Sequence, residues 1–302
     1  MALRQYLVEE VALDCAEGLL SRRDALRRLS LLGVSSGAAA ALLAACGGSE
    51  EASTTSGATP ATTPATTTPT SSATNVAGGE EIRFPGPRGE LIGVVATASP
   101  AQGAVLVIHE NRGLTDHIRS IPARLADDGY TALAIDLLSE EGGTASLPSG
   151  GDATAALGSA PPERLIADLR AGLDELERQA PDARLAAIGF CFGGGMTWQL
   201  LAAGEPRLAA AVPFYGPFPE GGTLDGSPNA AVLGVYAESD GRVNATMPAA
   251  EAALSAAGLT YELRVFEGVG HAFFNDTGPR YDADAAAQAY QAMLDWFAAN
   301  LA

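Results

Sequence analysis

The chain has 302 residues, of which 47% are hydrophobic and 18% charged, and this composition fits one globular domain of roughly 220 residues plus extensions. Its formal net charge is −18, and every basic residue is an arginine. Because nucleic-acid binding needs a basic face, the acidic surface argues against a nucleic-acid partner.

Residues 1–46 are predicted to be an export signal. The segment 21–26 (SRRDAL) resembles a twin-arginine motif. The apolar stretch 31–45 is shorter than the roughly 20 residues of a membrane-spanning helix, but it suits the apolar region of a signal peptide. Residues 43–46 (LAAC) resemble a bacterial lipobox, so we expect lipid on Cys46 and an exported protein anchored at the periplasmic side of the cell envelope. The alternative is an amphipathic N-terminal helix of the folded domain.

Residues 47–80 are predicted to be a disordered tether between this leader and the folded domain. The segment is rich in Thr, Ser, Ala, Pro and Gly, and it has almost no large apolar side chains. Such a composition cannot bury enough surface to offset the entropy that ordering costs. The folded domain is therefore expected to span residues 81–302.

Strand and helix patterns alternate through this domain. Segments 82–84 and 91–96 flank a Pro/Gly-rich turn and predict an antiparallel hairpin. An apolar run typical of a strand buried on both faces follows at 104–108, and the next buried strand is predicted at 131–137. Further strands are predicted at 185–189, 208–214, 231–236 and 261–266. Helices are predicted at 118–125 (with Asp116 as a possible N-cap), 165–176, 248–257 and 290–301, and a long loop at 142–158. This alternation predicts an α/β fold with a mostly parallel central sheet and helices on both faces.

The segment 189–194 (GFCFGG) has the pattern of a nucleophile elbow. It follows an apolar run and precedes a second one, so a strand, a sharp turn and a helix are expected in that order. Gly189 and Gly193 leave room for the turn, which would set Cys191 at a helix N-terminus, where backbone N–H groups favour a thiolate. The alternative is a glycine-rich turn that holds a buried cysteine. Of the three cysteines, Cys15 and Cys46 belong to the leader, which leaves Cys191 without a disulfide partner.

Asp240 and His271 each follow a predicted strand, and with Cys191 they give the chain order nucleophile, acid, histidine that α/β-hydrolases share. His271 would accept the proton of the thiol and later return one to the leaving group, while Asp240 would hold the imidazole tautomer. The nearest rival acids are Glu238 and Asp276. No cluster of Cys and His residues has metal-ligand spacing.

An oxyanion hole requires two backbone N–H donors. We expect them from Phe192, directly after the nucleophile, and from Asn111, in the loop after strand 104–108. His109 is predicted to pack at the end of that strand, and His117 to lie at the surface at a helix start.

These motifs resemble the dienelactone hydrolase family over roughly residues 82–302. The resemblance rests on the 189–194 elbow, on residues 109–113 (HENRG), on the Asp240 turn and on residues 270–273 (GHAF). It implies an α/β-hydrolase fold, hydrolysis of a lactone ring, and a triad of Cys191, Asp240 and His271 that works without a metal or an organic cofactor.

The resemblance also assigns a role to Glu110, which matches the family's glutamate. That glutamate contacts the resting thiol and swings away when substrate binds. The alternative is that Glu110 anchors its loop by pairing with Arg112 or Arg119.

One departure from the family pattern concerns the substrate. Well-studied members bind the substrate carboxylate with arginines, one of them four residues after the catalytic histidine. Asn275 occupies that position here, and the 142–158 loop has no arginine. Arg112 is the closest candidate replacement, so the carboxylated dienelactone is not the expected physiological substrate.

The sequence thus predicts a lipid-anchored, exported and monomeric hydrolase of a small ester or lactone, which acts through a thioester on Cys191. Two alternatives stand beside it. One is a broad carboxylesterase or thioesterase with a different acyl pocket. The other is a non-catalytic binding lipoprotein of the cell envelope that has the same fold.

Overall fold

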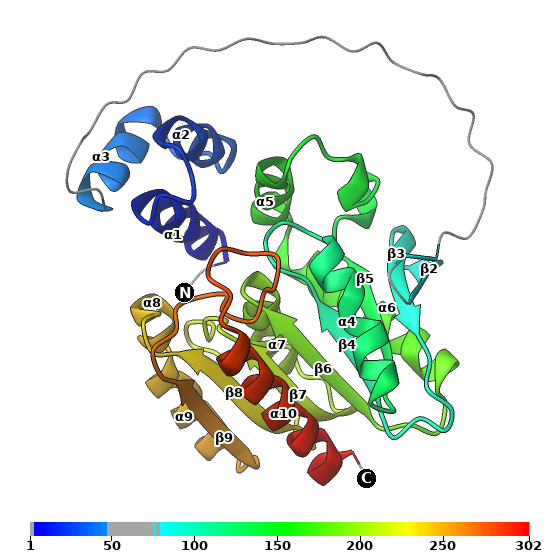
Figure 1. Cartoon of the computed structure of the whole chain (residues 1–302). Helices are drawn as coiled ribbons and strands as arrows, with labels where there is room; N and C mark the ends of the chain where they lie inside the picture. Colours follow the sequence, from blue (N-terminus) through cyan, green and yellow to red (C-terminus); the bar gives the residue numbers. More distant parts are fainter. Residues whose placement is uncertain (1–2, 47–74, 77–78, 302) are drawn as a thin grey trace, which may run out of the picture.

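The computed structural model describes residues 3–46, 75–76 and 79–301 (Figure 1). Most of the predicted tether, residues 47–74, therefore lies outside the described residues. The last part of that predicted tether pairs in the sheet, because Asn75 and Val76 lie opposite Glu80 and Gly79. The sheet thus includes residues on the N-terminal side of residue 81.

A nine-stranded sheet forms the centre of the domain, in the order β1-β2-β3-β5-β4-β6-β7-β8-β9. Its strands are β1 (Asn75–Val76), β2 (Gly79–Gly86), β3 (Gly89–Ala96), β4 (Ala104–Ile108), β5 (Thr131–Asp136), β6 (Leu185–Phe190), β7 (Leu208–Phe214), β8 (Ala231–Ala237) and β9 (Tyr261–Phe266). The first three strands and the β3–β5 pair are antiparallel, and all pairs from β5 to β9 are parallel. The predicted α/β fold with a mostly parallel sheet is confirmed.

Helices cover both faces of this sheet, which explains why β4 to β8 are buried along their whole length and are mostly apolar. Figure 1 shows α4 and α10 on the near face, with α6 and α7 behind it. The helices of the domain are α4 (Asp116–Asp127), α5 (Gly150–Ser159), α6 (Pro162–Gln179), α7 (Phe192–Ala202), α8 (Gly241–Asn244), α9 (Met247–Ala256) and α10 (Ala283–Asn300), and short 3-10 turns lie at Ser139–Glu141 and Thr144–Ser146.

Two local predictions differ from the structure. The predicted loop 142–158 contains helix α5, whose N-cap Ser149 accepts a hydrogen bond from the backbone N–H of Asp152. Asp116 is the first residue of α4, and Thr115 takes the N-cap position that was predicted for Asp116.

Three further helices precede the domain: α1 (Leu3–Ala16), α2 (Arg22–Leu31) and α3 (Ser36–Cys46). They contact one another, and α1 also contacts α5 and α7. In Figure 1 they form the blue group beyond one end of the sheet, with α1 nearest to it. Among the helices of the described ranges, none combines the length and the apolar character that a membrane crossing requires.

Candidate active site

Cys191 lies at the turn between β6 and α7, as the elbow pattern predicts. Its φ of 56° is in the left-handed region, which non-glycine residues adopt at a cost. A Cβ on Gly189 would lie 2.0 Å from the carbonyl oxygen of Gly193, and one on Gly193 would lie 2.2 Å from that of Ile108. The two glycines are therefore required for helix α7 to start so close to the strands.

The structure brings the three predicted triad residues together where β6, β8 and β9 end. Nδ1 of His271 lies 2.5 Å from Oδ2 of Asp240. The other carboxylate oxygen of Asp240 accepts from the backbone N–H of Val243 at 3.3 Å, so Asp240 also caps α8. The Sγ atom of Cys191 and a ring nitrogen of His271 lie within 4.8 Å of each other. All three side chains are buried.

The rival acids contact other groups. Asp276 lies 2.7 Å from Nδ1 of His117, and Glu238 accepts from the backbone N–H of Gly268 at 2.8 Å. The prediction that His117 lies at the surface is wrong, since only 2% of it is exposed and its ring packs edge-on against Phe274.

His109 is buried at the end of β4, and its Nε2 accepts from the backbone N–H of Leu137 at 3.1 Å. The predicted packing role of His109 is therefore confirmed. Burial lowers its pKa, so it stays neutral.

The two predicted oxyanion donors flank the nucleophile. Phe192 is the first residue of α7, so its N–H is among those that have no partner within the helix. Asn111 lines the same pocket as Cys191. Its carbonyl accepts from the hydroxyl of Thr154 at 3.0 Å, which ties the loop after β4 to α5.

Glu110 and Arg112 both line this pocket. Glu110 accepts from the side-chain amide of Asn275 at 2.6 Å, so the residue at the expected arginine position holds this glutamate. Burial raises the pKa of Glu110. Arg119 forms its ion pair with Glu81, at 2.8 Å, and not with Glu110.

The thiol and the imidazole have opposite charge preferences. Burial raises the pKa of Cys191, and the nearby carboxylate of Glu10 raises it further. Burial and Glu10 therefore oppose the thiolate that the helix N-terminus is expected to favour. Burial alone would lower the pKa of His271, but Glu10 and Asp240 outweigh it and hold that pKa well above its usual value.

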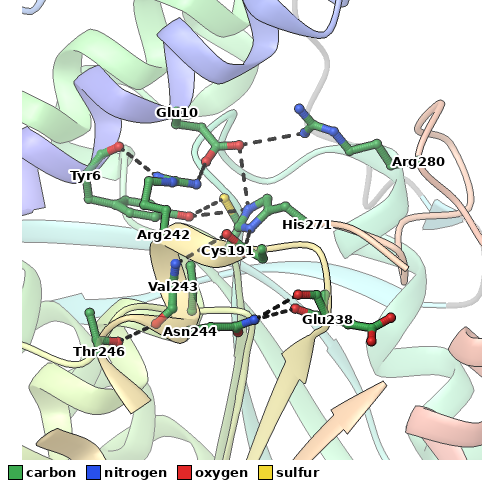
Figure 2. Close-up of polar contacts among 12 residues, drawn as sticks. Tyr6, Glu10, Cys191, Glu238, Arg242, Val243, Asn244, Thr246, His271 and Arg280 are labelled. Atoms are coloured by element: carbon green, nitrogen blue, oxygen red, sulfur yellow. Dashed lines mark hydrogen bonds and ion pairs between the residues drawn. The ribbon is translucent and has the colours of Figure 1, made fainter. Parts of the chain in front are cut away.

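Helix α1 supplies two site residues that the sequence analysis missed. The hydroxyl of Tyr6 lies 3.1 Å from Sγ of Cys191 and 3.4 Å from Nε2 of His271. The carboxylate of Glu10 lies 3.6 Å from the same ring nitrogen. Figure 2 shows both side chains reaching from α1 to the nucleophile and the histidine.

Two arginines of the domain hold these α1 residues in place, and the sequence analysis missed them as well. Arg242 forms an ion pair with Glu10, and its guanidinium lies over the ring of Tyr6, 4.5 Å from the centroid. Arg280 lies 2.8 Å from Asp14 and 3.8 Å from Glu10. Neither arginine stands at a position where the family resemblance places one.

The atoms of Glu10, Cys191 and His271 are also close enough to ligate one metal ion, since all three donor atoms lie within 4.8 Å of one another. A carboxylate, a thiolate and an imidazole are ligands that Zn²⁺ accepts. However, Arg242 already neutralises Glu10, and a second cation beside it would be repelled. The arrangement therefore favours a hydrogen-bonded site over a metal centre.

Comparison with known proteins gives a consistent result for the domain. The family model described as "Dienelactone hydrolase family" matches residues 91–301. A predicted carboxymethylenebutenolidase of Salmonella typhi is 37% identical over 209 residues, which cover 64% of this chain and 76% of that protein.

Two solved structures resemble the chain over its domain. The crystal structure of a predicted dienelactone hydrolase from Klebsiella pneumoniae subsp. pneumoniae has a TM-score of 0.63 and 31% identity, covering 73% of this chain and 98% of that one. That of a dienelactone hydrolase-like promiscuous phosphotriesterase from metagenomic libraries has a TM-score of 0.62 and 25% identity, covering 74% of this chain and 98% of that one.

Proposed function

Because this chain belongs to the dienelactone hydrolase family, we propose that it hydrolyses small esters or lactones through a thioester on Cys191. The observation that carries the proposal is the convergence of a cysteine, a histidine and an aspartate at the ends of three strands. Nδ1 of His271 lies 2.5 Å from Asp240, so the other ring nitrogen, Nε2, faces the side of the site on which Cys191 lies.

The reaction that we propose has two halves. His271 takes the proton of the thiol while sulfur attacks the carbonyl carbon, and the backbone N–H groups of Phe192 and Asn111 stabilise the oxyanion. The carbon–oxygen bond then breaks, and His271 returns the proton to the leaving oxygen. Water attacks the thioester with His271 as the base, which releases the acid and restores the thiol.

The test is a titration of the acyl-enzyme. Cys15→Ser and Cys46→Ser together leave Cys191 as the one cysteine of the chain. Excess p-nitrophenyl butyrate should then release a burst of one p-nitrophenolate per chain, and mass spectrometry should find one butyryl group on Cys191. A chain that releases no burst and carries no acyl group on that thiol, both before and after residues 3–46 have been removed by cleavage at a protease site inserted within residues 47–74, would refute the mechanism and would favour a binding protein of this fold.

The sulfur nucleophile also predicts which esters are cleaved. A thiolate is itself a good leaving group, so the tetrahedral adduct of an alkyl ester tends to return to the reactants. A phenolate or enolate leaving group lets the adduct proceed to the thioester. We expect kcat/KM for p-nitrophenyl butyrate to exceed that for ethyl butyrate by about 10³-fold or more, which corresponds to about 4 kcal/mol in the transition state. Similar values for the two esters would contradict this.

We further propose that the protein is exported and is anchored by lipid on Cys46. The support is the succession of the twin-arginine motif, the apolar stretch and the lipobox in residues 21–46. Mass spectrometry of the protein extracted from membranes should find a chain that begins at a diacylated Cys46. A soluble chain that retains residues 1–45 would contradict this proposal.

A further inference from the structure

Helix α1 has an acidic face, and that face covers the active site. Glu10 lies between Arg242 and Arg280 (Figure 2), and Asp14 pairs with Arg280 at 2.8 Å. Glu17 extends the same row and lies 2.7 Å from Arg280. The row of carboxylates on α1 thus matches the arginines that stand beside the triad.

The hydroxyl of Tyr6 lies where a substrate must bind. A carbonyl carbon has to come within about 3–3.5 Å of the attacking sulfur. The Tyr6 oxygen already lies 3.1 Å from that sulfur, and it is also within reach of Nε2 of His271. Tyr6 is fully buried, and burial together with the charges of Cys191 and Glu10 keeps the pKa of its phenol well above the usual value.

The space that is left beside Cys191 is small. The cavity measures about 200 Å³, and Glu10, Asp14 and Leu19 form part of its wall. Ligand pockets usually measure about 300–1,000 Å³. Because the N-terminal segment forms part of the wall, the cavity would widen if α1 left.

We propose that helix α1 is an autoinhibitory segment, which closes the active site of the full-length chain by placing Tyr6 and Glu10 where substrate would bind. The inference rests on the hydrolase function proposed above, and it adds a mode of regulation to that site. The family match begins at residue 91, so α1 is not part of it. Processing at Cys46 would detach α1 from the domain, so the exported form would be the open one.

The charges around His271 favour inactive protonation states of the triad in the full-length chain. Glu10 and Asp240 together favour the imidazolium, and Glu10 and burial favour the neutral thiol of Cys191. An imidazolium cannot accept the proton of the thiol. Departure of α1 would remove Glu10 from the site and leave Asp240 as the carboxylate beside the ring.

Helix α1 is anchored at a point that lies away from the reacting atoms. Leu7 is fully buried, and its Cδ1 atom lies near Gly158 of α5, 3.3 Å from where a Cβ on that glycine would stand. A buried aspartate at position 7 would lack a partner and would drive the helix off. Gln5, on the exposed side of the same helix, bonds to Glu9 and offers a matched position for a control.

The experiment uses the full chain with Cys15→Ser and Cys46→Ser, so that Cys191 is its one thiol. Leu7→Asp is compared with Gln5→Asp and with the parent. The rate at which iodoacetamide alkylates Cys191 and the kcat/KM for p-nitrophenyl butyrate are both measured. We expect Leu7→Asp to raise both by about tenfold or more, and Gln5→Asp to change neither.

The two readouts separate the two proposals. Faster alkylation without any ester hydrolysis in any variant would support closure by α1 and refute the hydrolase function. Faster alkylation with a fall in kcat/KM would overturn autoinhibition, because α1 would then complete the active site. Unchanged alkylation in a folded Leu7→Asp variant would overturn closure, whatever the hydrolytic rate.

A second route covers the case in which Leu7→Asp does not fold. A site for a sequence-specific protease is inserted within residues 47–74 of the full chain, and the protein is cut and diluted. Alkylation of Cys191 should accelerate after dilution, and a synthetic peptide of residues 3–20 should slow it again. A cut and diluted protein that reacts no faster than the uncut protein would overturn the inference.

Discussion

Replacing Cys191 by alanine is expected to lower kcat/KM for p-nitrophenyl butyrate by about 10⁴-fold or more, because no other group can form the acyl-enzyme. Cys191→Ser should also lose most of the activity. A serine hydroxyl has a far higher pKa than a thiol, and a site in which burial and Glu10 already disfavour the anion will not ionise it.

The effect of Cys191→Ala should lie in kcat rather than in folding. The side chain is small, and alanine fits the left-handed φ of 56° no worse than cysteine does. The thermal midpoint should therefore change little. Cys15→Ser is the matched control, since Cys15 is the second free thiol of the described residues and lies only partly buried on α1. Full activity in Cys191→Ala would remove the basis of the proposed function.

Asp240→Asn is expected to lower kcat by about 10³–10⁴-fold, with a small effect on KM. One oxygen of Asp240 lies against Nδ1 of His271, and the other accepts from the backbone N–H of Val243. An asparagine can present only one oxygen. If its NH₂ group faces the ring, His271 changes tautomer and Nε2 loses the lone pair that accepts the proton of the thiol.

The chain offers a matched control for this prediction. Asp276 and His117 form a second aspartate–histidine contact, with Nδ1 and Oδ1 2.7 Å apart, in which the histidine is buried and the aspartate is exposed. Asp276→Asn should leave kcat unchanged, and a pH–rate profile should show the base pKa altered in Asp240→Asn alone. Equal losses in both variants would mean that the acid of the triad has been assigned to the wrong residue.

Much of the fold could be predicted because the signals are local. A strand that is buried on both faces needs a continuous apolar run, and β4 to β8 all have one. Helix α5 was predicted as a loop because glycine and alanine dominate it. Its start was still marked by Ser149 and Asp152, which have the Ser-x-x-Asp spacing of a capping box.

The triad could be predicted because parallel strands bring their C-terminal ends to one edge of the sheet. Cys191, Asp240 and His271 each follow such a strand, so their order in the chain was enough to place them together. Contacts between distant segments carry no such signal. His117 was predicted at the surface because its partner Asp276 is 159 residues away in the sequence.

The same reason explains why the covering of the site by α1 was missed. Tyr6 is 185 residues from Cys191, and nothing in the local pattern of residues 3–16 distinguishes a helix that packs on a domain from one that precedes an export motif. The effect of burial and of Glu10 on the pKa of Cys191 was missed with it, because the helix N-terminus is visible in the sequence and these contacts are not.

The covalent link through residues 47–74 determines whether closure of the active site by α1 is an intramolecular or a bimolecular step. While the chain is intact, α1 and its docking site are two parts of one molecule, so the closed fraction should be the same at nanomolar and at micromolar protein. Once that link is cut, binding of the helix becomes bimolecular and weakens on dilution. A single peptide-bond cleavage within this link would thereby make the state of the enzyme depend on its own concentration.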